Sequence, residues 1–149
     1  MEVMFTPEIS LAPKKKHTGT VALNKMVSRL LYAFQPAAVQ HNSFFVNEVP
    51  VNFTVNADRN MLAAVISGLL NSVAGKTKNS CIHLGAKRYS NIILFRLQNL
   101  NADGNGHFEY NWREINPLVE KLGGCITIGE ANRRSSSITF SFRSLADAI

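Results

Sequence analysis

The apolar residues between Met61 and Val73 constrain the fold of this chain most strongly. They recur at the i, i+3, i+4, i+7 spacing that places side chains on one face of an α-helix. The set is Met61, Leu62, Val65, Ile66, Leu69, Leu70 and Val73. Asp58 precedes them at a position suited to an N-cap. A helix with such a face must bury it, so the sequence predicts a globular domain packed around this segment.

Weaker patterns on both sides of this helix predict the other elements. Apolar residues from Leu23 to Phe34 have helical spacing, which Pro36 weakens at its end. A shorter helical stripe between Trp112 and Leu122 ends at Gly123-Gly124, where glycine tolerates the left-handed backbone that ends helices. Alternating or apolar runs predict strands at 49–55, 81–84, 91–98, 125–128 and 137–142.

The predicted order is helix, strand, helix, strand, strand, helix, strand, strand. The strands at 81–84 and 91–98 are separated by a short turn, so they should pair as an antiparallel hairpin. Strands with one polar face need cover on the other face only. The fold class is therefore α/β: a two-layer sandwich with a mixed, mostly antiparallel sheet of about five strands covered on one face by three helices. Residues 1–19 are interpreted as an N-terminal leader or extra edge element, and residues 20–149 as one domain.

Charge and cysteine usage exclude several classes of function. The net charge of +6 is spread over separate Lys and Arg clusters without interleaved aromatic residues, so nucleic acid is not an expected partner. No apolar run approaches the roughly 20 residues that span a bilayer, and we expect a cytoplasmic protein. Cys81 and Cys125 belong to no Cys/His cluster with metal-ligand spacing, so we expect buried free thiols.

The order of elements, together with three short segments, resembles the catalytic ATP-binding domain of bacterial sensor histidine kinases. This is the histidine kinase-like ATPase fold (GHKL or Bergerat fold), shared with gyrase, Hsp90 and MutL. The segments are "MLAAVISGLLNSV" with Asp58 before it, "LVEKLGGCITIG" and "SSSITFSF". The resemblance extends from Leu23 to Phe142 and implies that residues 20–149 form such a domain, with ATP and magnesium as the family's ligands.

The resemblance places a magnesium-binding asparagine at Asn71. A neutral oxygen donor suits a hydrated hard cation. The family has an acidic or amide residue four positions earlier, where this chain has Ser67, a hydroxyl too weakly basic for that role. The family's lysine and threonine near the helix end match Lys76 and Thr77 only if the helix end shifts. The alternatives are that Asn71 is an exposed or capping polar residue and that Lys76 and Thr77 are a solvated helix exit.

The adenine-reading loop of the family has an aspartate followed by glycines at the second and fourth positions after it. Gly104 and Gly106 match those glycines only if Ala102 replaces the aspartate. Asp103 in that role breaks the spacing, whereas distance from the strand puts Asn99 there. No register recovers the motif, and "ADGNG" is also an ordinary turn sequence. The lid, which in the family is long and glycine-rich, has only residues 107–116 available.

These departures leave two hypotheses for function. The first is a degenerate, non-catalytic domain in bacterial signal transduction, a pseudokinase that binds a signalling protein partner and has weak or lost nucleotide binding. The second is a functional ATP-binding domain of a sensor histidine kinase or an anti-sigma-type kinase, which would be a protein histidine or serine kinase. We expect no cofactor in the first case, and ATP with magnesium in the second. In either case we expect a monomer or weak dimer.

Overall fold

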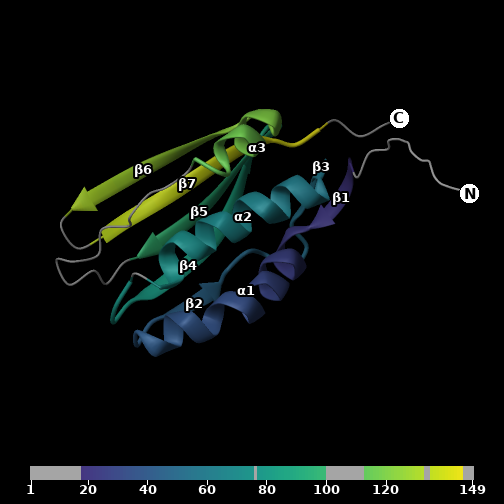
Figure 1. Ribbon diagram of the computed structural model, residues 1–149. Helices are drawn as coiled ribbons and strands as arrows, with labels where there is room; N and C mark the ends of the chain where they lie inside the picture. Colours follow the sequence, from purple (N-terminus) through teal and green to yellow (C-terminus); the bar gives the residue numbers. More distant parts are fainter. Residues whose placement is uncertain (1–17, 76, 100–112, 133–134, 146–149) are drawn as a thin grey trace, which may run out of the picture.

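The computed structural model describes residues 18–75, 77–99, 113–132 and 135–145. They form an α/β sandwich with three helices on one face of a five-stranded sheet, and a second sheet of two strands at one end (Figure 1). The helices are α1 (Leu23–Gln40), α2 (Arg59–Ala74) and α3 (Asn116–Lys121). The strands are β1 (Thr18–Ala22), β2 (Phe44–Asn47), β3 (Thr54–Asp58), β4 (Cys81–Tyr89), β5 (Ile92–Asn99), β6 (Cys125–Asn132) and β7 (Ser135–Arg143). No helix in the described ranges is long and apolar enough to cross a membrane.

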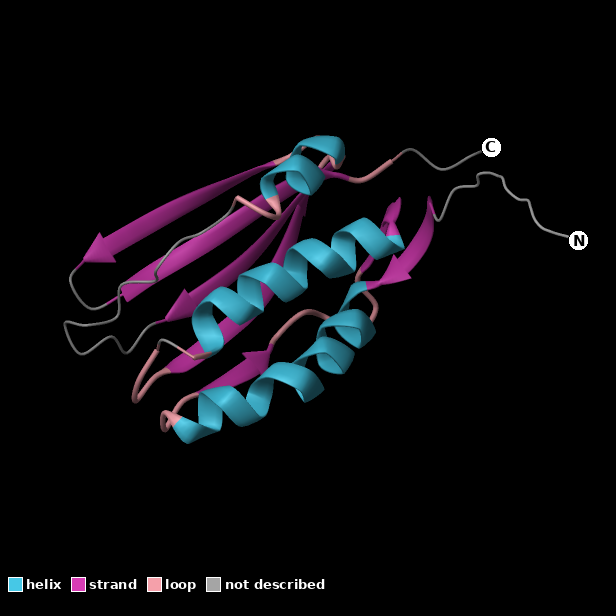
Figure 2. Cartoon of the chain, in the orientation of Figure 1, coloured by secondary structure: helices cyan, strands magenta, loops and turns pink. Residues whose placement is uncertain are grey.

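The five strands lie in the order β2-β4-β5-β7-β6. The β2–β4 pair is parallel and the other pairs are antiparallel, which confirms the predicted mixed, mostly antiparallel sheet. Figure 2 shows the helices on one side of this sheet. Alternate side chains of the central strands are buried beneath the helices: Ile82, Leu84, Ile93, Phe95, Leu97, Ile138, Phe140 and Phe142. No helix of the described ranges covers the other face of the sheet.

Helix α2 forms as its periodicity predicts. The carboxylate of Asp58 accepts a hydrogen bond from the Met61 N–H at 3.0 Å, which confirms the N-cap. Leu62, Val65, Ile66, Leu69, Leu70 and Val73 are buried, and Met61 is packed against the core at its edge. The apolar stripe of α1 packs into the same core, where Leu23, Met26, Val27 and Leu31 are buried and Leu30 and Phe34 are partly buried. These two helices and the sheet beneath them therefore enclose one continuous core.

The predicted end of α1 is wrong, because the helix includes Pro36 and continues to Gln40. Proline removes the N–H that would bond the carbonyl of Tyr32. Pro36 is exposed and the Tyr32 side chain is 87% exposed, so this side of the helix faces solvent and water can bond that carbonyl. Just before the proline, the Gln35 side-chain amide exchanges hydrogen bonds of 3.2 and 2.8 Å with the carbonyl and N–H of Phe45. This pairing covers the exposed edge of β2.

The single strand predicted at 49–55 is also wrong. The chain forms β2 earlier and β3 later, and a turn with a hydrogen bond of 3.0 Å from the Phe53 N–H to the Pro50 carbonyl lies between them. Val51 lies in this turn and is 82% exposed. Strand β3 pairs with β1 in the separate small sheet. Strand β1 begins at Thr18, within two residues of the expected end of the N-terminal segment.

The remaining elements follow the predictions with shifted ends. The hairpin of β4 and β5 is confirmed, but its strands extend inward to a turn at Ser90 and Asn91. Strands β6 and β7 lengthen in the same way. Helix α3 is shorter than predicted, has Pro117 in its first turn, and ends before Gly123, whose φ is +70°.

Candidate nucleotide cleft

The candidate cleft is defined by α2, by the helix exit after it, and by the end of β5. Asn71 lies on α2 with its side chain exposed, and Ser67 lies one turn earlier and is half-buried. Positions four apart on a helix share a face, so Ser67 and Asn71 lie on the same face of α2. No hydrogen bond within the described part of the chain engages either the Asn71 amide or the Ser67 hydroxyl. Asn71 is therefore the one predicted ligand that the described structure presents to solvent.

Helix α3 packs against α2 beside this face, at Gly68. A Cβ atom at Gly68 would lie 2.6 Å from Cγ2 of Ile115, the residue before α3. Glycine is therefore required by close packing of the two segments. This contact could not be predicted from the sequence, because a single glycine within a helical pattern does not indicate which residue approaches it.

Within the helix exit Thr77 is buried, although Gly75, Lys78 and Asn79 are exposed, so the alternative of a solvated exit is wrong for Thr77. Thr77 is 5% exposed, and its hydroxyl donates to the carbonyl of Val73 at 2.9 Å. The Thr77 carbonyl in turn accepts a hydrogen bond of 3.1 Å from the hydroxyl of Ser43. Thr77 thus connects the end of α2 to the residue before β2 and does not face solvent. Lys76 lies outside the described residues.

Asn99 is fully buried at the end of β5. Its Nδ2 donates to Oγ of Ser80 at 3.0 Å, and the Ser80 N–H donates to Oγ of Ser43 at the same distance. The three side chains join the starts of β2 and β4 to the end of β5. Ser43 and Ser80 were not predicted as site residues, and scattered serines carry no pattern that would have identified them.

The other predicted ligands cannot be placed. Asp103, Gly104 and Gly106 lie in the segment 100–112, outside the described residues. Within the described ranges, no group of three or more His, Cys, Asp or Glu side chains could hold a metal ion. Asn71, Thr77 and Asn99 are consequently the predicted residues whose surroundings are known, and only Asn71 is exposed.

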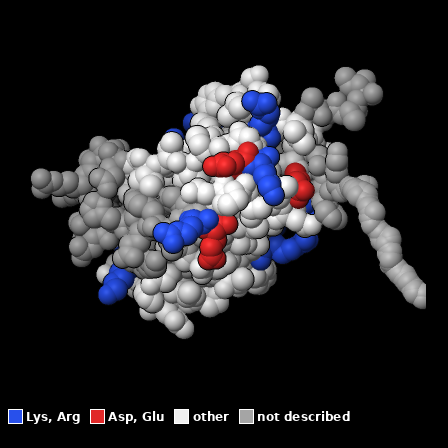
Figure 3. All heavy atoms as spheres, turned by 45° about the horizontal axis from the view of Figure 1, so that its top comes forward, with Lys and Arg blue, Asp and Glu red and all other residues white. Residues whose placement is uncertain are grey.

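On the face shown in Figure 3, acidic and basic side chains are interspersed among the described residues, with no continuous basic surface.

Both thiols are free, but the predicted burial is wrong, since Cys81 is half-buried and Cys125 is exposed. Cys81 lies beside a histidine: its Sγ is 3.6 Å from Nε2 of His83, whose Nδ1 is 2.9 Å from Oε2 of Glu48. Residues two apart on a strand share a face.

Comparison with solved structures identifies the fold. The chain superposes on the histidine kinase AdeS of Acinetobacter baumannii with a TM-score of 0.72 and 12% sequence identity, covering 88% of this chain and 69% of AdeS. The nucleotide-free catalytic domain of histidine kinase ThkA superposes with a TM-score of 0.68 and 16% sequence identity, covering 85% of this chain and 95% of the ThkA domain. ThkA in complex with the response regulator protein TrrA gives a TM-score of 0.67 and 16% identity, covering 86% of this chain and 42% of the matched chain.

No protein-family model and no curated protein matches the chain. The structural similarity confirms the fold that the sequence resemblance implied: this chain has the histidine kinase-type ATP-binding fold. At these identities the similarity establishes the fold, and the function depends on the residues at the site.

Proposed function

We propose that this chain is a degenerate histidine kinase-type domain that acts in signal transduction by binding a partner protein, with weak or lost nucleotide binding and no kinase activity. The observation that carries the proposal is the state of Asn99. Judged by its distance from the strand, it stands where the family has the adenine-reading aspartate, yet it is wholly buried and its amide nitrogen is bonded to Ser80. A side chain held in this way stabilises the protein and is not presented to a base.

The other positions support the same proposal. Thr77, which would face the phosphates, is buried and its hydroxyl is bonded to Val73. Ser67 offers a hydroxyl where a general base or an orienting amide would be needed. Asn71 alone retains a suitable ligand, and one neutral oxygen donor holds magnesium poorly, because the ion depends on carboxylates and substrate phosphates.

The partner we propose is a signalling protein in the cytoplasm. Among the structures with this fold, ThkA has been solved in complex with the response regulator protein TrrA, which supports a signalling protein as the partner. Such binding depends on the surface and needs no intact nucleotide site, so it can persist after the catalytic positions have changed.

The alternative is a functional ATP-binding domain of a histidine kinase or an anti-sigma-type serine kinase, with ATP and magnesium as ligands. The exposed position of Asn71 on α2 favours it, because magnesium could still bridge this side chain and the phosphates.

Calorimetric titration with Mg-ATP distinguishes the two hypotheses. Several missing charge-assisted contacts, each worth about 1.5–3 kcal/mol, weaken binding by orders of magnitude. We therefore expect no binding, or a Kd no tighter than about 1 mM, and little change in Asn71→Ala. A micromolar Kd that disappears in Asn71→Ala would reject the degenerate site and support the kinase.

A further inference from the structure

Gly85 lies in the interior of β4, and the backbone does not explain why it is glycine. The pairing of β4 with β5 is continuous from Ile82 to Tyr89, so Gly85 is not at a bulge. Its φ is not among the positive values of the described residues. A Cβ atom added to it would meet no heavy atom within 4 Å. Glycine destabilises a strand, and an interior glycine often marks the close approach of a ligand.

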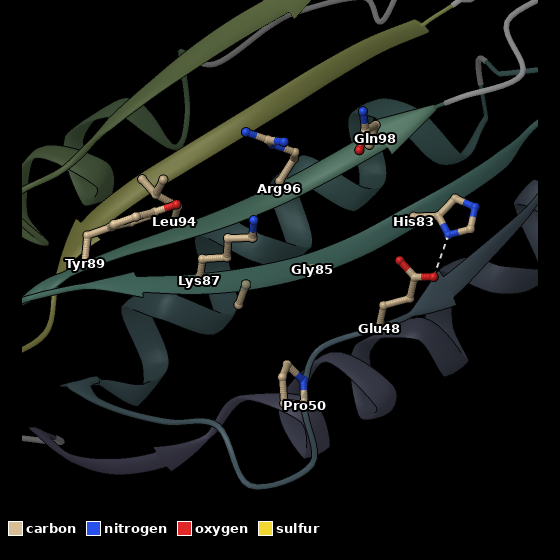
Figure 4. Close-up of a pocket in the computed structure, with 10 residues that line it drawn as sticks. Glu48, Pro50, His83, Gly85, Lys87, Tyr89, Leu94, Arg96 and Gln98 are labelled. Carbon is tan, nitrogen blue, oxygen red and sulfur yellow. Dashed lines mark ion pairs between the residues drawn. The ribbon is translucent and has the colours of Figure 1, made fainter.

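Gly85 lies at the floor of a shallow pocket of about 360 Å³ on the sheet face without helices. Figure 4 shows Lys87 and Arg96, from the adjacent strands β4 and β5, beside Gly85. His83 and Gln98 line one end of the pocket, and Tyr89 and Leu94 line the other. The pocket therefore has a polar end, a basic middle and an end with apolar surface.

Among the described residues, no acidic side chain pairs with the basic middle of the pocket. Lys87 and Arg96 are exposed, and neither forms an ion pair in the described part of the chain. Glu48 is the one carboxylate among the lining residues that the structure describes, and it is engaged by His83 Nδ1 at 2.9 Å. Two adjacent cations above an open floor attract an anion, and the planar guanidinium can bond two oxygens of a phosphate or carboxylate.

We propose that this pocket binds a small organic anion in which a phosphate or carboxylate adjoins an aromatic or aliphatic group. Arg96 donates hydrogen bonds to the anionic oxygens and Lys87 adds a second positive charge. The missing side chain at Gly85 leaves room for the ligand to reach the sheet. Tyr89 and Leu94 contact the apolar part, since binding pockets combine apolar walls with a few placed polar groups. The site lies on the opposite side of the sheet from α2, and is separate from the nucleotide cleft.

The test is a titration of the full chain, labelled with ¹⁵N, with phenyl phosphate while amide chemical shifts are followed by NMR. Inorganic phosphate provides the anion without the ring. Gly85→Val fills the pocket and keeps both cations, and valine suits a strand, so its melting temperature shows whether it remains folded. Arg96→Gln removes one charge, and Lys78→Gln removes one exposed charge outside the pocket.

We expect phenyl phosphate to produce saturable shifts at Gly85, Arg96 and Gln98, with a Kd lower than that of inorganic phosphate. Arg96→Gln should raise the Kd about tenfold or more, and Gly85→Val should abolish the shifts without lowering the melting temperature. Lys78→Gln should leave the Kd unchanged. The absence of saturable shifts, equal affinity for the two phosphates, or undiminished binding by folded Gly85→Val would each overturn the proposal.

Discussion

Nδ2 of Asn99 lies 3.0 Å from Oγ of Ser80, and this hydrogen bond joins the last residue of β5 to the residue before β4. Ser80 is also bonded through its N–H to Ser43, at the start of β2. The three strands are therefore held together at one edge of the sheet. Asn99, one of the positions considered for the adenine-reading residue, is thus part of the structural support of the domain.

Asn99→Ala should lower the free energy of unfolding by about 1–3 kcal/mol, because it removes a buried hydrogen bond and leaves Ser80 without this donor. Urea denaturation followed by circular dichroism measures the change. Asn71→Ala is the matched control, since Asn71 is exposed, and should change stability by no more than about 0.5 kcal/mol. Similar small effects of both substitutions would contradict the structural role of Asn99.

Gly68→Ala should destabilise the domain although alanine is the better helix former by about 1 kcal/mol. The new Cβ would lie 2.6 Å from Cγ2 of Ile115, and such overpacking typically costs about 1–3 kcal/mol. A double-mutant cycle with Ile115→Ala, read from unfolding free energies, should show that part of the penalty disappears when Cγ2 is removed. Additive effects would mean that the contact with Ile115 is not its cause.

Alkaline pH should destabilise the protein partly through Cys81. Burial of the thiol, followed by the nearby Glu48 carboxylate, raises the pKa of Cys81 above its ordinary value of 9.0. The folded protein therefore holds this proton more tightly than the unfolded chain. This proton stabilises the folded state fully at pH values below the pKa of Cys81 in the unfolded chain. The stabilisation is lost as pH rises through the pKa of Cys81 in the folded protein. Unfolding free energies measured between about pH 7 and about pH 11 should fall less steeply in Cys81→Ala than in the wild type; equal slopes would refute this.

The chain should be a monomer or a weak dimer, because the apolar stripe of α1 is buried within its own domain. Light scattering coupled to size-exclusion chromatography should give the monomer mass at low concentration. Tyr32→Asp, on the exposed side of α1, serves as the diagnostic variant and should leave that mass unchanged. A stable wild-type dimer that Tyr32→Asp converts to a folded monomer would show that α1 mediates association.

The sequence by itself determined the elements whose signals are local. The periodicity of α2, its Asp58 cap and the glycine after α3 all act within one or two helical turns, where side chains three or four positions apart are already neighbours. Helices, hairpins and their order could therefore be predicted, and the order carried the family resemblance that the fold confirms. Asn71 could be placed on the exposed part of α2 for the same reason.

Only the tertiary structure decided which sheet each strand joins and which polar residues are buried. Val51 and Val55 have the same place in an alternating pattern, yet Val51 is exposed in a turn and Val55 is buried in β3. Strand β2 could not be predicted from the sequence, because its edge depends on hydrogen bonds from Gln35 of α1. Asn99 and Thr77 have structural roles because the fold brings Ser80 to Asn99, and Val73 and Ser43 to Thr77. Burial and hydrogen bonding of this kind depend on partners distant in the chain, so no local pattern of residue types can specify them.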